Sequence, residues 1–215
     1  MGDLKKLIIL GEAVADGAPL SPEYWLSKKQ VEFLADGIPL SELVDIKRQT
    51  SGIAESSWLV LDTGNADRGL LNLRGNESKD RTSQKKLVPE GAVIVSRLRP
   101  YLKQVAYLPL GTAERLKKSA IYCSTEFYVL ITKSPDENVA YLVPWLLSDQ
   151  VQAVFAQATT GGHHPRFDED LLEQLVVPHD WYKRRKKVSA DVEEAVERHL
   201  TSQLAMFELV DQTKI

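Results

Sequence analysis

The sequence predicts an α+β fold in which a twisted, mixed or antiparallel β-sheet is flanked by helices and followed by a C-terminal amphipathic helix. The middle of the chain alternates short β-rich runs with Gly, Asn, Asp and Pro residues, which is typical of strands joined by turns. Residues 139–158 and 189–211 instead place apolar side chains at a helical period. With 215 residues and 43% hydrophobic content, the chain can bury a core of ordinary size.

Two helix starts precede the expected sheet. Ser21 opens a Ser-Pro-Glu run and predicts the N-cap of a helix that extends to about Ala35. Ser41, followed by Glu42, has the same capping chemistry and predicts a shorter second helix.

Six strands are expected between residues 58 and 131, each a run of β-branched, aromatic or other apolar residues with turn-forming residues close behind it. The predicted strands are Trp58–Leu61, Leu70–Leu73, Ala92–Val95, Gln104–Leu108, Ile121–Tyr122 and Glu126–Ile131. A helix over Val139–Ala158 follows them, with Pro144 in its first turns, where proline is tolerated.

The tail carries the clearest amphipathic helix, Ser189–Asp211, with Ser189 as the predicted N-cap. Its apolar face consists of Val192, Val196, Leu200, Leu204 and Phe207. At 1.5 Å per residue the helix spans roughly 35 Å, and it can pack on its own domain or pair with a second copy or a partner subunit. The basic run Lys183–Lys187 favours the partner, because it divides the chain into a domain over residues 1–182 and a basic linker with an association helix over residues 183–215.

The cysteine content and the N-terminus indicate a cytoplasmic protein. The single cysteine, Cys123, has no partner for an internal disulfide bond, so the sequence does not require an oxidising compartment. The apolar run Leu7–Leu10 is too short for a signal-peptide core or a membrane span.

The charge is unevenly distributed along the chain. A net charge of −3 at first argues against a nucleic-acid-binding protein, because phosphate contacts require Lys and Arg. Residues 68–118, however, contain 12 Lys and Arg against 4 acidic residues. Salt screening confines such a patch to its own surroundings, so one basic face is compatible with an acidic total. The charge pattern alone fits either a polyanion-binding face or a solvated surface of mixed charge.

Arg97 and Arg99 directly follow a predicted strand, and Pro100 ends the extended run. The planar guanidinium group suits guanine O6 and N7 or a phosphate, and Tyr101 can add a hydrogen bond to a phosphate. The alternative for both arginines is a structural ion pair.

The loop Gly75–Lys86 contains no apolar residue and four basic ones, Lys79, Arg81, Lys85 and Lys86. We expect it either to enter a DNA groove or to be an ordinary surface loop.

The run Gly161–Arg166 contains His163, His164 and Arg166. Adjacent histidines point in different directions in an extended chain, and no Cys or acidic residue stands at ligand spacing, so we predict no metal site. The glycines permit a tight turn, and the imidazoles and Arg166 are expected to meet phosphates or a partner.

Four segments of the chain carry sequence motifs of one known protein family. The central signature resembles G-D-V-L-I-S-R-x-R-P-Y-L-x-K-V-A at Gly91–Ala106, with Ala92 in place of the usual Asp. The closing signature resembles A-T-G-G-x-x-P-R-I-x-x-x-D-L-x-x-L-x-V-P-x-P at Ala158–Pro178, after which His179 stands where a second proline is frequent. The segments Ile38–Ile46 and Trp58–Asn65 are also similar to the family. With these four segments in this order, the chain resembles a target recognition domain of the specificity subunits of type I restriction-modification systems.

This resemblance implies a non-catalytic half-subunit that recognises a double-stranded DNA sequence without a cofactor. It also implies a DNA methyltransferase subunit as partner, in some systems a restriction or translocase subunit, and a homodimer formed through the C-terminal helix in a defence complex. With the basic residues above, the predicted DNA-binding set is Lys79, Arg81, Lys85, Lys86, Arg97, Arg99, Tyr101, Lys103, His163, His164 and Arg166.

Two alternatives remain open from the sequence. Asp62-Thr63-Gly64 after an apolar strand is the pattern of an aspartic protease half, in which two carboxylates share a proton. The apolar run Ala92–Val95 does not complete that pattern, because it ends at Ser96 and not at glycine. The second alternative is a protein adaptor of the same fold that does not bind DNA.

Overall fold

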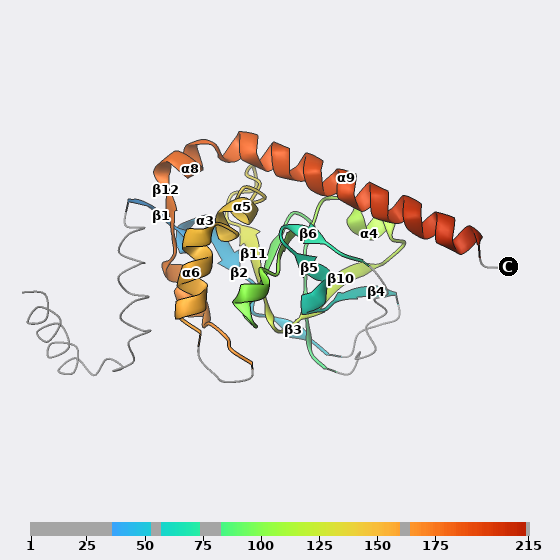
Figure 1. Cartoon of the computed structure of the whole chain (residues 1–215), viewed down its shortest axis with the longest axis horizontal. Coiled ribbons are helices and arrows are strands. Elements are labelled where there is room, and N and C mark those ends of the chain that lie inside the picture. Colours follow the sequence, from blue (N-terminus) through green and yellow to red (C-terminus); the bar gives the residue numbers. More distant parts are fainter. Residues whose placement is uncertain (1–35, 53–56, 74–82, 160–163, 214–215) are drawn as a thin grey trace, which may run out of the picture.

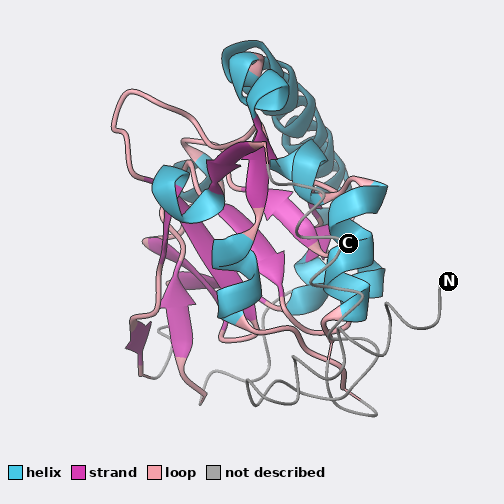
Figure 2. Ribbon diagram, turned by 90° about the vertical axis from the view of Figure 1, so that its left-hand side faces the viewer, coloured by secondary structure: helices cyan, strands magenta, loops and turns pink. Residues whose placement is uncertain are grey.

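The computed structural model describes residues 36–52, 57–73, 83–159 and 164–213. The helix expected over residues 21–35 lies outside these ranges. Figure 1 shows the strands beside a group of short helices, with one long C-terminal helix across the molecule, and Figure 2 shows the strands at its centre. The predicted α+β class is therefore confirmed.

The first sheet has four strands in the order β2-β11-β8-β9, and every pair is antiparallel. The strands are β2 (Val44–Ile46), β11 (Phe127–Thr132), β8 (Val93–Ser96) and β9 (Val105–Tyr107). Both β8 and β11 lie in the interior of this sheet, and their sequences are almost continuously apolar, as expected for strands that are covered on both faces.

The second sheet is mixed and has the order β3-β7-β10-β4. Its strands are β3 (Thr50–Ser51), β7 (Lys85–Leu87), β10 (Ala120–Ser124) and β4 (Trp58–Leu61). β10 runs parallel to β4 and antiparallel to β7. Two smaller antiparallel pairs complete the strands: β1 (Gly37–Pro39) with β12 (Val176–Pro178), and β5 (Ala66–Asp67) with β6 (Leu70–Leu71). All six predicted strands are present, with ends that differ by at most two residues.

The core has two parts, one on each face of the first sheet. Val93 and Val95 of β8 face a cluster made largely with helical side chains, whereas Ile94 between them faces the second sheet. Side chains alternate along a strand, so a buried strand contributes to both layers. The molecule is thus layered as helices, first sheet and second sheet.

The helical layer corrects one prediction. The segment 139–158 is not one helix but two, α5 (Leu142–Leu146) and α6 (Asp149–Gln157). Ser148 has extended backbone angles between them, and its hydroxyl accepts a hydrogen bond from Val151 N (3.4 Å). Ser148 therefore acts as an N-cap that starts a new helix inside a continuous apolar pattern.

Shorter helical elements connect the strands. They are α3 (Leu40–Leu43), α4 (Thr112–Arg115), α7 (Glu169–Gln174), α8 (His179–Lys183) and the 3₁₀ turns η1 (Thr63–Asn65) and η2 (Pro100–Leu102). The helix predicted from Ser41 is α3, but Pro39 precedes it and Ser41 lies inside it. Its first amide, Leu40 N, donates instead to Leu175 O (2.7 Å).

The C-terminal helix, α9 (Arg185–Gln212), begins earlier than predicted. Ser189 is not its N-cap; it is buried in the helix, where its hydroxyl accepts from Tyr141 N (3.2 Å) and donates to Asn138 O (3.3 Å). Only Arg184 separates α8 from α9, so the basic run is helical and is not an extended linker.

The predicted partner-binding face of α9 packs on the chain itself (Figure 1). Val196 and Leu200 are buried, Val192 packs partly buried against the helical part of the core, and Leu204 and Phe207 pack against the part between the sheets. The assignment of these five residues to a partner interface was therefore wrong for the buried ones, because their apolar side chains pack into the two parts of the core. Within the described ranges, no helix is both long and apolar enough to cross a membrane.

Candidate nucleic-acid interface

The turn after β8 has an uncommon backbone. Arg99 (φ 48°, ψ 61°) and Lys103 (φ 53°, ψ 39°) both adopt left-handed angles and bracket η2. Leu102 N donates to Arg99 O (2.9 Å), and Lys103 N donates to Pro100 O (2.8 Å). Non-glycine residues in this region cost of order 1 kcal/mol each, so the surrounding structure must impose the conformation.

Two neighbouring segments hold this turn in place. Arg99 N donates to Pro165 O (2.8 Å), and Arg68 N donates to Lys103 O (3.1 Å). Leu98 and Arg166 form an antiparallel β-bridge, which joins the central motif to the segment before α7. The two sequence motifs that are similar to the specificity subunits therefore meet at one place in the fold.

Glu126 lies beneath this junction and binds two arginines. Arg166 makes two hydrogen bonds to it, Nε to Oε2 (3.0 Å) and Nη2 to Oε1 (2.7 Å), and Arg97 Nε also donates to Oε2 (3.0 Å). The pKa of Glu126 lies below its usual value, and the hydrogen bonds from Arg166 are the largest cause. Partial burial opposes this shift, and the hydrogen bond from Arg97 adds to it. Two guanidinium groups face one carboxylate, so this group of three keeps a positive charge.

Two further cationic side chains lie on the same turn. Arg99 Nη2 is 3.2 Å from His164 Nδ1, which orients the guanidinium toward the 164–166 segment. Lys103 Nζ lies 3.5 Å from Asp149 Oδ1 at the start of α6, and the side chain of Asp149 is fully exposed. Such a long, solvated ion pair contributes little energy and does not prevent Lys103 from reaching a phosphate.

The structure brings together six residues of the predicted DNA-binding set: Arg97, Arg99, Tyr101, Lys103, His164 and Arg166. The predicted contacts Lys79, Arg81 and His163 lie outside the described residues. The remaining two, Lys85 and Lys86, lie in the second sheet and not in the loop.

Burial removes Lys85 and Lys86 from the predicted contact surface. They are 3% and 8% exposed in β7. Lys86 Nζ donates to Phe127 O (2.9 Å) and lies 5.6 Å from the centre of the Tyr128 ring, and burial lowers its pKa. Lys85 Nζ donates to Ser83 O (3.3 Å). The polar composition of this segment hid a short strand, because pairing with β10 outweighs the low β-propensity of lysine.

The site also contains three residues that are not in the predicted set: Arg68, Glu126 and Leu102. Glu126 is 40 residues from Arg166 in the sequence, and no local pattern links the two. Arg68 precedes Gly69, and glycine at this position was the sequence signal for a turn. In the structure Arg68 has a positive φ of 46°. Leu102 is an apolar residue close behind Pro100, which turns the chain, and this position was its signal in the sequence. In the structure its side chain is 43% exposed.

The Asp62-Thr63-Gly64 motif forms a local turn. Asp62 precedes η1, Asp62 N donates to Asn65 Oδ1 (2.7 Å), and Asn65 Nδ2 donates to Asn72 O (2.6 Å). These bonds give the motif a structural role at the end of β4, where a polar residue is needed to start the 3₁₀ turn.

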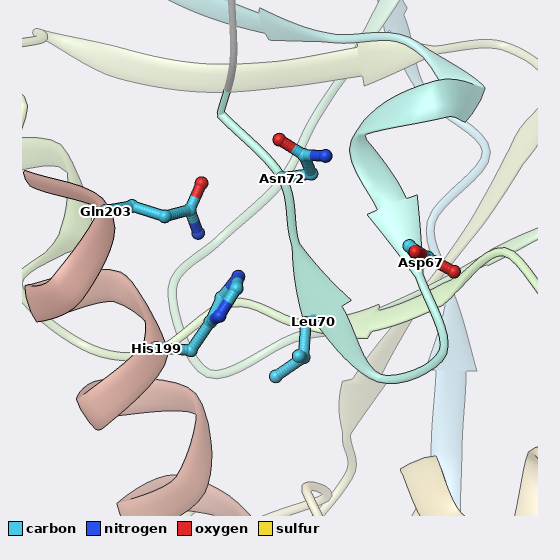
Figure 3. A pocket seen from close by; sticks show the side chains of 5 residues that line it. All are labelled: Asp67, Leu70, Asn72, His199 and Gln203. Atoms are coloured by element: carbon cyan, nitrogen blue, oxygen red, sulfur yellow. The ribbon is translucent and has the colours of Figure 1, made fainter. Parts of the chain in front are cut away.

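A hollow of about 300 Å³ lies between α9 and the β5–β6 pair (Figure 3). Gln203 Nε2 donates to Leu71 O (2.6 Å), Leu73 N donates to Gln203 Oε1 (2.9 Å), and His199 Nε2 lies 3.2 Å from the same Leu71 oxygen. The side-chain amide of Gln203 thus pairs with the backbone groups of Leu71 and Leu73 as a neighbouring strand would, and these hydrogen bonds join α9 to the β5–β6 pair. The hollow is the space beside these contacts between α9 and the β5–β6 pair.

No family model matches the sequence, and no curated protein is significantly similar to it. Among solved structures, the chain is similar to the HsdS subunit from Thermoanaerobacter tengcongensis, with 13% sequence identity and a TM-score of 0.40. The alignment covers 97% of this chain and 49% of that chain, so this chain spans about half the length of the HsdS subunit.

Proposed function

We propose that this chain is a sequence-specific module that recognises double-stranded DNA and directs a partner DNA methyltransferase or restriction complex. The observation that carries the proposal is the junction of the two motifs: Leu98 pairs with Arg166, and Arg97 and Arg166 share Glu126. Segments far apart in sequence thereby present cationic side chains on one surface. The module supplies recognition and no catalysis of its own.

The chemistry of this surface suits a duplex. Arginine can contact guanine O6 and N7 with two hydrogen bonds, which discriminates bases, whereas lysine contacts phosphate as a point charge. Arg97 is one-third exposed beside its carboxylate, and Lys103 is similarly exposed. Arg97 and Arg99 are therefore the proposed base-reading residues, and Lys103, Arg166 and His164 the proposed phosphate contacts.

The partner is proposed to bind the distal part of α9, in a chain divided near residue 182 into a reading part and an associating part. Met206, Leu209 and Val210 are 58%, 56% and 51% exposed there, while Val188, Val196 and Leu200 on the preceding part of the helix are buried on the domain. This apolar end is proposed to bind, in the cytoplasm, a methyltransferase subunit or a second copy of the chain. A homodimer formed in this way would read two half-sites.

The test is selection from a random duplex library by the full chain, followed by sequencing. We expect enrichment of one motif and binding that weakens steeply as salt rises. Arg97→Ala and Arg99→Ala should each weaken or relax recognition by about 1–3 kcal/mol without unfolding the protein. Arg198→Ala is the matched control, because this arginine is 73% exposed on α9, away from the junction. Absence of enrichment at low salt, with a folded protein, contradicts the proposal.

A protein adaptor of the same fold is the second candidate. The observation that favours it is the pairing of Arg97 and Arg166 with Glu126, which lowers the charge available to a polyanion. It predicts that no duplex is retained in a salt-dependent manner, so the same titrations separate the two functions.

A further inference from the structure

Tyr101 and Leu102 are adjacent apolar residues that the fold leaves in solvent, 62% and 43% exposed. The other large exposed apolar side chains of the described residues are Leu110, Met206, Leu209 and Val210. Tyr101 and Leu102 differ from these in lying at the tip of η2, in the middle of the cationic junction. Paired exposure of this kind on a folded domain marks a contact surface.

The tip is held in one conformation. Left-handed backbone at Arg99 and Lys103 brackets it, and hydrogen bonds from Arg99 N to Pro165 O and from Arg68 N to Lys103 O join it to two other segments. Such backbone strain persists where the surrounding structure imposes it, and it accumulates at ligand contacts. The two side chains therefore project without a loss of backbone entropy on binding.

The surroundings of the tip are cationic. Arg99 precedes it, Lys103 follows it, and the exposed Arg68 is joined to Lys103 through the backbone. Asp149, whose carboxylate lies 3.5 Å from Lys103 Nζ, is fully solvated. An apolar tip between positive groups matches a DNA groove, where phosphates line both rims and bases form the floor. A protein partner would have to supply an apolar pocket that is surrounded by acidic side chains.

We propose that Tyr101 and Leu102 form an apolar wedge that enters a groove of the duplex and opens one base step. The Tyr101 ring stacks on an exposed base face, Leu102 fills the space between the bases, and Lys103 holds a flanking phosphate. This inference rests on the proposed function and deepens it, because it assigns specificity to apolar contacts and to the deformability of one step. It also makes the ring of Tyr101 the contact, and not its hydroxyl.

The first test compares full-chain variants on the selected duplex across a salt series. Tyr101→Ala and Leu102→Ala should each weaken binding by about tenfold or more, as loss of base stacking does, with an unchanged slope of log K against log [salt]. Tyr101→Phe should bind as wild type. Lys103→Ala should instead lower the slope by about 0.9, because it removes a phosphate contact. Equal slope losses in the alanine variants of the tip and of Lys103 would overturn the wedge.

The second test detects opening of the base step. A fluorescent adenine analogue, 2-aminopurine, is placed at successive positions of the selected duplex, and its emission rises where stacking is lost. Wild type and Tyr101→Phe should produce a rise at one step, and Leu102→Ala should abolish it. A duplex that stays stacked at every position with bound wild type overturns the inference.

Leu110→Ala is the control for both tests, since it removes an exposed apolar side chain (67%) that has no part in the proposed DNA or partner contacts. Circular dichroism melts confirm that each variant is folded. Wild type that binds no duplex defeats the proposed function itself. Wild type that binds, with Tyr101→Ala and Leu102→Ala binding equally well, defeats the wedge alone and assigns the tip to another partner.

Discussion

Arg97 and Arg166 donate to the same carboxylate oxygen, since the Nε atom of each lies 3.0 Å from Glu126 Oε2. Arg97 follows β8 and Arg166 precedes α7, so Glu126 fixes two segments as well as two charges. A shared acceptor orients both guanidinium planes before any ligand arrives, which reduces the entropy lost when they bind.

Replacing Glu126 should separate affinity from discrimination. Glu126→Gln removes a negative charge from the proposed contact surface, so the variant should bind a random-sequence duplex more tightly, with a salt slope steeper by about 1. It should also lose preference for the selected duplex, because neither arginine is held by a charged acceptor. Fluorescence anisotropy titrations on both duplexes measure the two effects. Glu194→Gln, at an exposed site on α9, should change neither. An unaltered ratio of the two affinities would exclude a positioning role for Glu126.

The same carboxylate predicts a pH dependence of stability. Its pKa is lowered in the folded protein from an ordinary value of 4.5, so the unfolded chain takes up the proton first as pH falls. The stabilisation is therefore complete above pH 4.5 and is lost as pH falls through the lower folded pKa. Urea unfolding of wild type and Glu126→Gln should differ modestly at neutral pH, because the ion pairs are partly solvated. That difference should shrink in acid; a constant difference across the range would refute the linkage.

Burial of Lys86 predicts that it makes no phosphate contact. Lys86→Met should leave the salt slope of duplex binding unchanged, whereas Lys103→Met should reduce it by about 0.9. Both changes delete one ammonium group and keep an unbranched side chain, so the pair is matched in chemistry and differs in exposure. A reduced slope for Lys86→Met would show that β7 opens to meet DNA, and that the original prediction for this lysine was right.

Docking of α9 on its own domain is testable by stability. Leu200 is 2% exposed, so Leu200→Ala should lower the free energy of unfolding by about 2–5 kcal/mol. Leu209 is 56% exposed, and Leu209→Ala should stay within about 0.5 kcal/mol of wild type in dilute protein. Urea unfolding at two protein concentrations gives both values. If Leu200→Ala were as mild as Leu209→Ala, the helix would not be part of the folded monomer.

Local patterns predicted the elements well. The strands Trp58–Leu61 and Phe127–Thr132 were visible as apolar runs between turn formers, and the period of the last helix was evident over most of its length. The break at Ser148 was missed because a helical pattern continues through it, and the early start of α9 was missed because Ser189 has the residue type of an N-cap and yet bonds to Tyr141 and Asn138. Burial of Lys86 depends on the strands with which β7 pairs, and the composition of this segment does not determine that pairing.

The sequence by itself determined the fold class, the strands, the presence of an amphipathic tail and the two motifs that contain Arg97 and Arg166. Only the tertiary structure decided that these arginines share Glu126, that Val196 and Leu200 face inward, and that Tyr101 and Leu102 project at the junction. The physical reason is range. Periodicity and turn chemistry act over a few residues, whereas ion pairing and burial depend on segments that approach one another only after the sheets have formed.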